Sequence, residues 1–413
     1  MTPDSGQPSS QQVRLRALRG VAHCCDMLAG QSFEIRNAAA ALVASSRHIG
    51  LDAQLVSVDA PDSAHGVAAW ERRFPASSGP RWLGASSKLH HWLRTSAGAG
   101  EIGMLHAHGA WNMASVYPGW VAKWNWTPLV ANPMGMLSGF AFERYSRIGG
   151  AFWRFVQRPA LRAATCLQAA TRDEAADLRR LGMRQPIALI PRGTRVAEPK
   201  PDRSGPLSVV CCGDFSLGEA AAFAARACIA CLRRTGEPRP DFRFIARGTV
   251  GDLDKWSQGS IARSLRETGV SISESAPLAD PLDAYAGVDI ALPVGDAEIA
   301  TALASGTPAI VVGQDSWRRI EMQRAGWWCE PSAESLERTI ASALSLDRRE
   351  LDAMGDAGRR WMSAERAWPK IARDTLLLYD WIVSGMPEKD RHDWIIAAEP
   401  DETARQAEEE GHC

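Results

Sequence analysis

The chain has 413 residues, of which 45% are hydrophobic and 23% are charged, and its formal net charge is −1. This length is too great for one hydrophobic core and suits two domains of ordinary size. No apolar run approaches the ~20 residues that a membrane span requires, and the polar segment Met1–Gln12 lacks the apolar region of a signal peptide. We therefore expect a cytoplasmic protein.

Strands and helices alternate along the first half of the chain. An apolar run at 20–25 precedes a helical pattern over 37–49, which ends at Gly50. Further strands are expected at 53–58, 103–106, 129–132, 166–170 and 187–190. Such alternation predicts a parallel sheet with helices on both faces. The polar segment 198–206 has three prolines and is predicted to be a linker.

The same alternation returns in the second half. Strands are expected at 207–212, 241–246, 271–273, 290–294 and 309–312, and helices at 219–234, 254–268, 280–286 and 297–305, before a helical region at 332–384. Two Rossmann-like domains bind ligands at the carboxyl ends of their parallel strands. Functional residues are therefore sought at those strand ends.

Charge is unevenly distributed between the halves. Residues 1–200 carry 23 Lys and Arg against 13 Asp and Glu, whereas the remainder carries 24 against 35. The first domain is therefore expected to meet an anionic partner. No recognised nucleic-acid-binding motif accompanies this charge, so nucleic acid is not expected.

Aromatic residues alternate with arginines over 140–158. A basic amphipathic helix of this kind lies on an anionic membrane surface, or it buries its aromatic face in the core and solvates its basic face. The arginines that would contact the membrane are Arg144, Arg147, Arg154 and Arg158.

The chain has nine cysteines, and Cys228 and Cys231 form its one CxxC pair. A redox or metal site is one interpretation of such a pair, but no second pair or histidine cluster accompanies it. Small buried thiols are the favoured interpretation, and no metal is expected.

Several segments, in their order and spacing, resemble the landmarks of family 4 glycosyltransferases, which have the GT-B fold. Among them are His106–Trp111 (HAHGAW), Pro133–Leu137 (PMGML), Ala302–Ile310 (ALASGTPAI) and Gly326–Cys329 (GWWC). The resemblance spans 20–384. It implies an α/β protein whose two Rossmann-like domains face each other across a cleft. The second domain would bind a nucleotide-diphosphate sugar and the first an acceptor, with no cofactor.

Six segments follow from the patterns and the resemblance together. In relatives, the helix that corresponds to 368–382 crosses back to the first domain, and the same is expected here. The segments are a disordered N-terminus (1–12), an acceptor domain (13–197), a linker (198–206), a donor domain (207–364), returning helices (365–386) and an acidic disordered tail (387–413).

The donor site departs from the family pattern. Relatives carry Gly-Arg and then Lys-Gly against the diphosphate, but here Asp214 follows Gly213, and an aspartate repels an anion. Relatives also carry two glutamates seven residues apart, and Thr301 stands in the place of the second. The candidate donor-binding residues are Gly213, Arg247, Asp296, Glu298, Thr301 and Arg192.

Each charged candidate has a second interpretation. Arg192 supplies the missing positive charge or is a solvated turn residue. Arg247 contacts phosphate or base, or lies on the surface. Glu298 holds a ribose, or it is favoured by the dipole at the start of its helix.

On the acceptor side the candidates are His108, Gly109, Met134 and Gly135. Met134 stands where relatives carry His or Arg, and a thioether neither carries charge nor donates a strong hydrogen bond. His108 binds a ligand, or it orders the loop at Gly109 while His106 packs inward. No catalytic residue can be assigned from this pattern.

The resemblance leads to a glycosyltransferase, retaining if active, that uses a glycan or lipid-linked acceptor in bacterial surface-polysaccharide assembly. It would be cytoplasmic and peripheral at the inner face of the cell membrane. The first alternative is an inactive relative that serves as partner or scaffold of an active glycosyltransferase. A module that binds anionic glycans is the second. Fold alone does not separate these.

Overall fold

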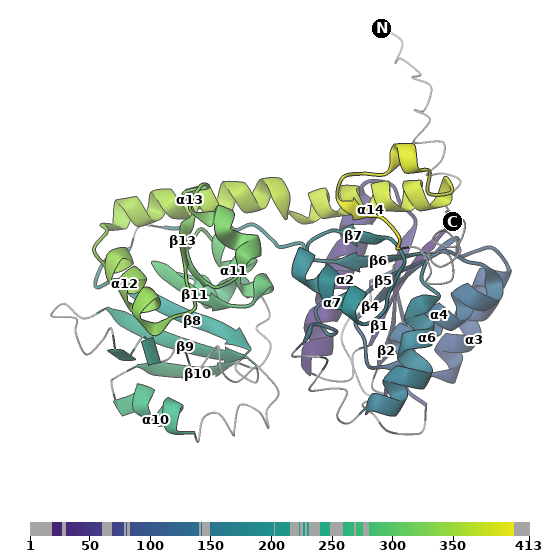
Figure 1. Ribbon diagram of the computed structural model, residues 1–413, viewed down its shortest axis with the longest axis horizontal. Helices are drawn as coiled ribbons and strands as arrows, with labels where there is room; N and C mark the ends of the chain where they lie inside the picture. Colours follow the sequence, from purple (N-terminus) through teal and green to yellow (C-terminus); the bar gives the residue numbers. More distant parts are fainter. Residues whose placement is uncertain are drawn as a thin grey trace, which may run out of the picture. The chain divides into compact units, whose positions relative to one another are not determined.

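The computed structural model describes residues 19–26, 30–59, 68–77, 80, 83–139, 142, 149–201, 203–214, 223, 226–227, 229–230, 240–247, 259–267, 270–275 and 281–399. The chain divides into two compact units. Unit 1 combines Met1–Arg192 with Ile371–Cys413, and unit 2 is Gly193–Lys370. Each unit contains one mostly parallel sheet with helices packed against it (Figure 1).

The sheet of unit 1 has eight described strands in the order β14-β7-β6-β5-β4-β1-β2-β3. Neighbouring strands are parallel except β14, which pairs antiparallel with β7. The bounds are β1 (Val21–Asp26), β2 (Ala53–Asp59), β3 (Glu71–Pro75), β4 (Met104–His108), β5 (Leu129–Asn132), β6 (Cys166–Ala169), β7 (Ile187–Leu189) and β14 (Ile395–Ile396).

Helices cover both faces of this sheet, and β1 is therefore buried along its whole length. Ala22 and Cys24 join the core beneath α3 and α4, whereas His23 faces Tyr379 of α14 on the opposite side. The helical elements are α2 (Gly30–His48), α3 (Ser87–Gly98), α4 (Met113–Asn125), η2 (Trp153–Gln157), α6 (Arg158–Arg162), α7 (Arg172–Arg180), α14 (Trp368–Val383) and η6 (Glu388–Asp390).

Local sequence explains where these helices begin and how closely they pack. Ser86, Asn112 and Thr171 cap α3, α4 and α7, each accepting a backbone N–H bond from the first turn. Gly119 lets α4 cross α6, since a Cβ there would lie 2.4 Å from the carbonyl oxygen of Ala160.

The sheet of unit 2 has six described strands in the order β10-β9-β8-β11-β12-β13, all parallel. The strands are β8 (Ser208–Asp214), β9 (Asp241–Arg247), β10 (Ser271–Ser275), β11 (Ile290–Val294), β12 (Ala309–Val312) and β13 (Gly326–Cys329). The helices are α10 (Ser260–Glu267), η4 (Pro281–Tyr285), α11 (Asp296–Ala304), η5 (Asp315–Ile320), α12 (Ala333–Leu344) and α13 (Arg348–Glu365).

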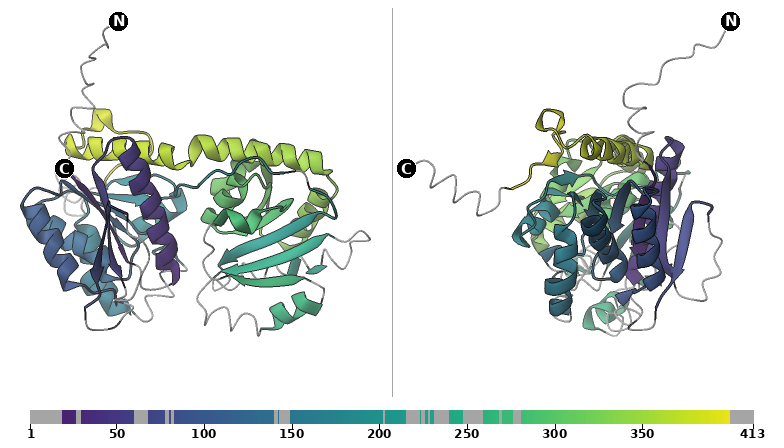
Figure 2. Two further views of the ribbon diagram at one scale, coloured as in Figure 1. Left: turned by 180° about the vertical axis from the view of Figure 1, so that it is seen from behind. Right: turned by 90° about the vertical axis from the view of Figure 1, so that its right-hand side faces the viewer.

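Alternate residues of β8 separate the two faces of this sheet. Val209 and Cys211 pack with α12, whereas Val210 and Cys212 pack with α11. Figure 2, which shows the units from behind and from one side, places α10 beside the β10 edge, in agreement with Figure 1. The predicted α/β class with two parallel Rossmann-like sheets is confirmed.

Two features differ from the sequence-based expectation. The boundary between the units falls at Gly193, before the predicted linker. Residues 388–399, expected to be disordered, instead form η6 and β14, and Ile395 is 1% exposed where it pairs with Ala188. The acidic composition of this segment obscured its short apolar run. Residues 1–12 and 400–413, the remaining parts predicted to be disordered, lie outside the described residues.

Candidate functional site

The carboxyl ends of β4 and β5 carry two loops with left-handed backbone, 108–112 and 132–137, which we call the strand-end loops. Trp111 has φ 67° and Met134 has φ 54°, although neither is a glycine. Gly109 and Gly135 have φ 84° and 81°. Such conformations cost about 1–3 kcal/mol in a non-glycine residue and cluster at functional sites.

Hydrogen bonds join the two strand-end loops into one structure. The Gly109 N–H donates to the Asn132 carbonyl at 2.9 Å, and the Trp111 indole N–H donates to the Met136 carbonyl at 2.9 Å. The structure therefore brings the acceptor-side candidates together, namely His108, Gly109, Met134 and Gly135.

Gln157 supports the strand-end loops from a π-helical turn, η2. Its Oε1 accepts from the Trp111 backbone N–H at 2.9 Å and from the Ser115 hydroxyl at 3.3 Å. π-Helical turns are often found at functional sites because they displace a side chain from the regular helical face. No local sequence pattern predicts this role.

Glu174 is a second supporting residue that was not predicted from the sequence. Its carboxylate accepts the backbone N–H groups of Gly135 and Ala170, both at 2.7 Å, and the side chain is buried. Thr171 caps the same helix three residues earlier. The pattern Thr-x-x-Glu is the available signal, because it is typical of a helix N-terminus. Glu174 thereby fixes Gly135 against β6 and α7.

His108 belongs to a buried chain of side chains beneath the strand-end loops. His23 Nδ1 lies 3.0 Å from His108 Nε2, and the Tyr379 hydroxyl lies 2.6 Å from His106 Nδ1 and 3.5 Å from His23 Nε2. Burial lowers the pKa of His108 to about 3 and holds the pKa values of His23 and His106 well below their usual range. All three imidazoles are therefore neutral at pH 7.

The same three histidines offer ring nitrogens within 4.8 Å of one another, as a metal site would. Their geometry fits a hydrogen-bonded chain better. The His106 and His108 rings stack with their centres 4.2 Å apart at 23°, and short polar contacts already engage one nitrogen each of His106 and His108. The ring planes of His23 and His108 are nearly parallel, at 11°, and Nδ1 of His23 lies 3.0 Å from Nε2 of His108. That no metal is needed stays a prediction.

In unit 2, the backbone at the ends of β8, β9 and β11 brings the donor-side candidates together. Asp214 lies beside Arg247 and Gly213 beside Val294 in the strand register. A Cβ at Gly213 would lie 2.5 Å from the Cβ of Val294, so only glycine fits. The rest of the segment that follows Gly213, 215–219, lies outside the described residues.

Asp296, at the start of α11, is engaged inside unit 2. Arg366 donates to both of its carboxylate oxygens, at 2.7 and 3.1 Å, and the Trp317 indole N–H donates at 3.0 Å. The Arg366 guanidinium also lies 4.5 Å from the centre of the Trp317 ring. Arg366, a cation at this helix N-terminus, was not among the residues that the sequence predicted.

The other donor candidates have neighbours of their own. The Thr301 hydroxyl donates to the Ala297 carbonyl at 2.7 Å, one turn back in α11. The carboxylate of Glu298 lies close to Gly295, at the helix N-terminus. Arg192 belongs to unit 1, where it donates to the Glu34 carbonyl at 3.3 Å and lies 3.6 Å from the Glu34 carboxylate.

Part of the predicted basic surface is described, and it has aromatic neighbours. Arg154 is exposed and Arg158 is half-buried, whereas Arg144 and Arg147 lie outside the described residues. Trp124, Trp126 and Phe155 are 77%, 91% and 71% exposed. Trp126 shares a hollow with Lys123 and Arg162, between the end of α4 and α6. We call these side chains of 123–126 and 154–162 the aromatic-basic patch.

Cys228 and Cys231 lie outside the described residues, so their interpretation stays a prediction. Trp327 and Trp328 lie on β13, the edge strand, and are half-buried. Trp328 donates to the Gln314 carbonyl and stacks under Arg318, 3.8 Å from the ring centre. No described helix is long and apolar enough to cross a membrane.

Several solved structures share the fold of this chain. Sucrose-phosphate synthase from Thermosynechococcus elongatus is similar at 17% identity and TM-score 0.61, over 89% of this chain and 100% of that one. Anabaena HepE, in complex with UDP and glucose, is similar at 12% identity and TM-score 0.64, over 89% of this chain and 100% of that one. A glycosyltransferase from Rickettsia africae is similar at 12% identity and TM-score 0.62, over 88% of this chain and 98% of that one. The chain has the fold of GT-B glycosyltransferases.

The family follows from the sequence of unit 1. Residues 11–193 match the family described as Glycosyl transferase 4-like domain. Residues 11–193 thus form a domain that matches this family, as the resemblance implied. No curated protein matches the chain.

Proposed function

We propose that the protein is a retaining glycosyltransferase that moves a sugar from a nucleotide-diphosphate sugar to a glycan or lipid-linked acceptor in surface-polysaccharide assembly. The observation that carries this proposal is the left-handed backbone at Trp111 and Met134, in the two strand-end loops of a domain that matches this family. Strain of this kind persists where a loop must present its backbone in one conformation.

The diphosphate needs positive charge as it becomes a leaving group. In unit 2 the N-terminus of α11 offers backbone N–H groups that no side chain caps, and a helix N-terminus favours an anion. Arg366 cancels the charge of Asp296 at the same place. This pair removes the repulsion that Asp296 alone would bring.

The donor interaction is tested by calorimetric titration with UDP-, GDP- and ADP-sugars. Asp296→Asn removes the carboxylate charge and frees the guanidinium, so affinity is expected to rise about tenfold, as one charge-assisted contact allows. Arg366→Ala is expected to lower affinity below wild type, and Arg338→Ala, on exposed α12, serves as the control. Unchanged affinity in both Asp296 and Arg366 variants would place the donor elsewhere.

A second candidate function is an inactive partner of an active glycosyltransferase. It is favoured by Met134, which brings no charge to the acceptor side, and by Thr301, whose hydroxyl is bonded within its own helix. This candidate predicts no sugar release from any nucleotide sugar, even with Asp296→Asn. Turnover by the wild-type protein would exclude it.

We also propose that the protein works at the cytoplasmic face of an anionic membrane, through the aromatic-basic patch. Trp and Phe side chains enter the headgroup region while Arg and Lys meet anionic lipid. Exposure of 91% for Trp126 and 77% for Trp124 supports this, because large aromatic side chains are seldom so open without a partner.

Flotation with phosphatidylglycerol vesicles at low salt tests the membrane proposal. Wild-type protein should float, and Trp124→Ser with Trp126→Ser should reduce the bound fraction several-fold. Arg154→Glu with Arg162→Glu should do so only at low salt, because exposed charges are screened. Arg338→Glu makes an equal charge change on unit 2 and should have no effect. Wild-type protein that ignores these vesicles would exclude the proposal.

A further inference from the structure

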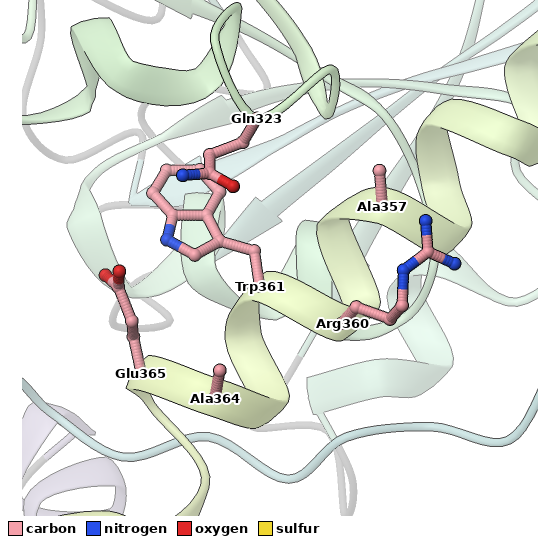
Figure 3. Close-up of a pocket in the computed structure, with 6 residues that line it drawn as sticks. All are labelled: Gln323, Ala357, Arg360, Trp361, Ala364 and Glu365. Atoms are coloured by element: carbon pink, nitrogen blue, oxygen red, sulfur yellow. The ribbon is translucent and has the colours of Figure 1, made fainter.

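Unit 2 has a hollow beside the C-terminal end of α13 that none of the functions above uses. Its volume is about 350 Å³, and Figure 3 shows the side chains that line it. Small-molecule sites measure ~300–1,000 Å³, so this one has room for a monosaccharide. The lining residues are Gln323, Ala357, Arg360, Trp361, Ala364 and Glu365.

Trp361 provides the hollow with a buried hydrogen-bond donor. The side chain is 8% exposed, and its indole N–H has no hydrogen-bond partner among the described residues. Its ring is fixed edge-on against Trp317, with centres 5.5 Å apart at 74°. A buried indole N–H usually has a partner, because leaving such a donor unpaired costs about 1–3 kcal/mol. A ligand atom that accepts this hydrogen bond would be stabilised here.

The neighbours of this N–H select the kind of ligand. Figure 3 shows the indole nitrogen on the side of the ring toward the Glu365 carboxylate, with the Gln323 amide above the ring. An anion at this point would be repelled by Glu365, and an ammonium group cannot accept from the indole N–H. A hydroxyl group accepts from Trp361 and donates to Glu365 at once. Gln323 offers both a donor and an acceptor to a second hydroxyl.

We propose that the hollow binds a neutral carbohydrate residue, with its hydroxyls held by Trp361, Glu365 and Gln323. Glu365 is already oriented by Arg319, at 3.1 Å, so little ordering is needed on binding. Recognition is through the polar groups of the rim, since Trp317 packs edge-on against the Trp361 ring and the Arg319 guanidinium lies 5.9 Å from its centre. The site is separate from α11, although Trp317 contacts both Trp361 and Asp296. Binding here requires no turnover.

The test uses the indole N–H itself as the reporter. In a ¹H–¹⁵N spectrum of the full chain, Trp361→Phe removes one indole signal and keeps an aromatic ring, which assigns that signal. In the wild type, added glucose is expected to shift this signal with saturation in the millimolar range. Glu365→Gln is expected to weaken glucose binding about tenfold, which one charge-assisted hydrogen bond explains. This exposed position allows the change without loss of the fold.

Three outcomes would overturn the proposal. Glucose that leaves the Trp361 signal unmoved excludes carbohydrate at this site, even if the Trp317 signal or others shift through binding near α11. Inorganic phosphate that shifts the Trp361 signal as glucose does excludes selection for a neutral ligand. Unchanged glucose affinity in Glu365→Gln excludes the assigned contacts, and Arg338→Ala controls for surface changes. None of these outcomes depends on nucleotide-sugar binding, so failure here is distinguishable from failure of the proposed donor site.

Discussion

The strand ends of the two units are held by different kinds of interaction. In unit 1, a buried carboxylate, an amide and strained backbone fix the strand-end loops, with neutral histidines beneath them. In unit 2, an ion pair between Asp296 and Arg366 sets the charge at the start of α11. The strand ends of unit 1 are therefore held by a buried carboxylate, neutral side chains and backbone geometry, and those of unit 2 by an ion pair. Acid and salt should act on the two units differently.

The largest expected difference is at acidic pH. The folded pKa of each buried histidine lies below its ordinary value of 6.5, so the unfolded chain binds more protons below pH 6.5 and stability falls. At pH 5 the loss from His108, whose folded pKa is about 3, is about 2 kcal/mol, and His23 and His106 act in the same direction. Gly193–Lys370 contains no histidine.

Proteolysis with peptide mapping at pH 7.5 and pH 5 distinguishes the units. Cleavage sites in unit 1 should open first on acidification, while those in unit 2 stay protected. Lys200, whose pKa burial lowers to about 7, is protonated in both states below that pH and adds little change. Equal opening of the two units at pH 5 would contradict the contrast.

The next effect concerns Glu174. Glu174→Ala leaves the N–H groups of Gly135 and Ala170 without their acceptor, and two hydrogen bonds to a charged group correspond to about 3 kcal/mol or more. Urea unfolding measures the loss. Asp173→Asn, an exposed change in the same first turn of α7, should cost less than about 0.5 kcal/mol. Similar losses in the two variants would mean that the buried carboxylate does not hold the loop.

The smallest effect tests the backbone strain alone. Gly135→Ala meets no atom within 4 Å, but φ is +81°, so the substitution should destabilise unit 1 by about 1 kcal/mol. Gly139→Ala also meets open space, without a positive φ, and should be neutral or stabilise by up to about 1 kcal/mol. Thermal unfolding of this pair isolates the left-handed conformation. The two substitutions are expected to change the unfolding temperature in opposite directions. Equal changes would show that the loop relaxes around Gly135→Ala.

The sequence predicted much of the fold because burial leaves a local pattern. Continuous apolar runs such as 290–294 predicted strands that the structure contains, and Gly50 predicted the end of α2. β14 was missed since its two residues are too few to show a period. The strand-end loops were found through the resemblance, which placed Met134 and Gly135 beside His108.

The supporting residues could not be predicted in this way. Gln157, Arg366 and Tyr379 act through neighbours far away in the sequence, and no local pattern links Tyr379 to His106. The sequence does not distinguish Trp361 from any other buried aromatic residue. Its distinguishing feature is structural, because its N–H has no hydrogen-bond partner among the described residues. Contacts of this kind depend on how distant segments meet, which spacing does not encode.

The hydroxyl of Tyr379 has a consequence for how the protein is made. Unit 1 begins at the N-terminus but is completed by Ile371–Cys413, so unit 2 is an insertion within it. At ~5–20 residues per second, the ribosome releases the histidine strands well before the helix that carries Tyr379. Until then the nascent chain holds three imidazoles on the central strands β1 and β4 without the phenol that completes their hydrogen bonds. Unit 2 is continuous in sequence and does not depend on a later segment. A released chain that ends before Ile371 would therefore contain all of unit 2 but only part of unit 1.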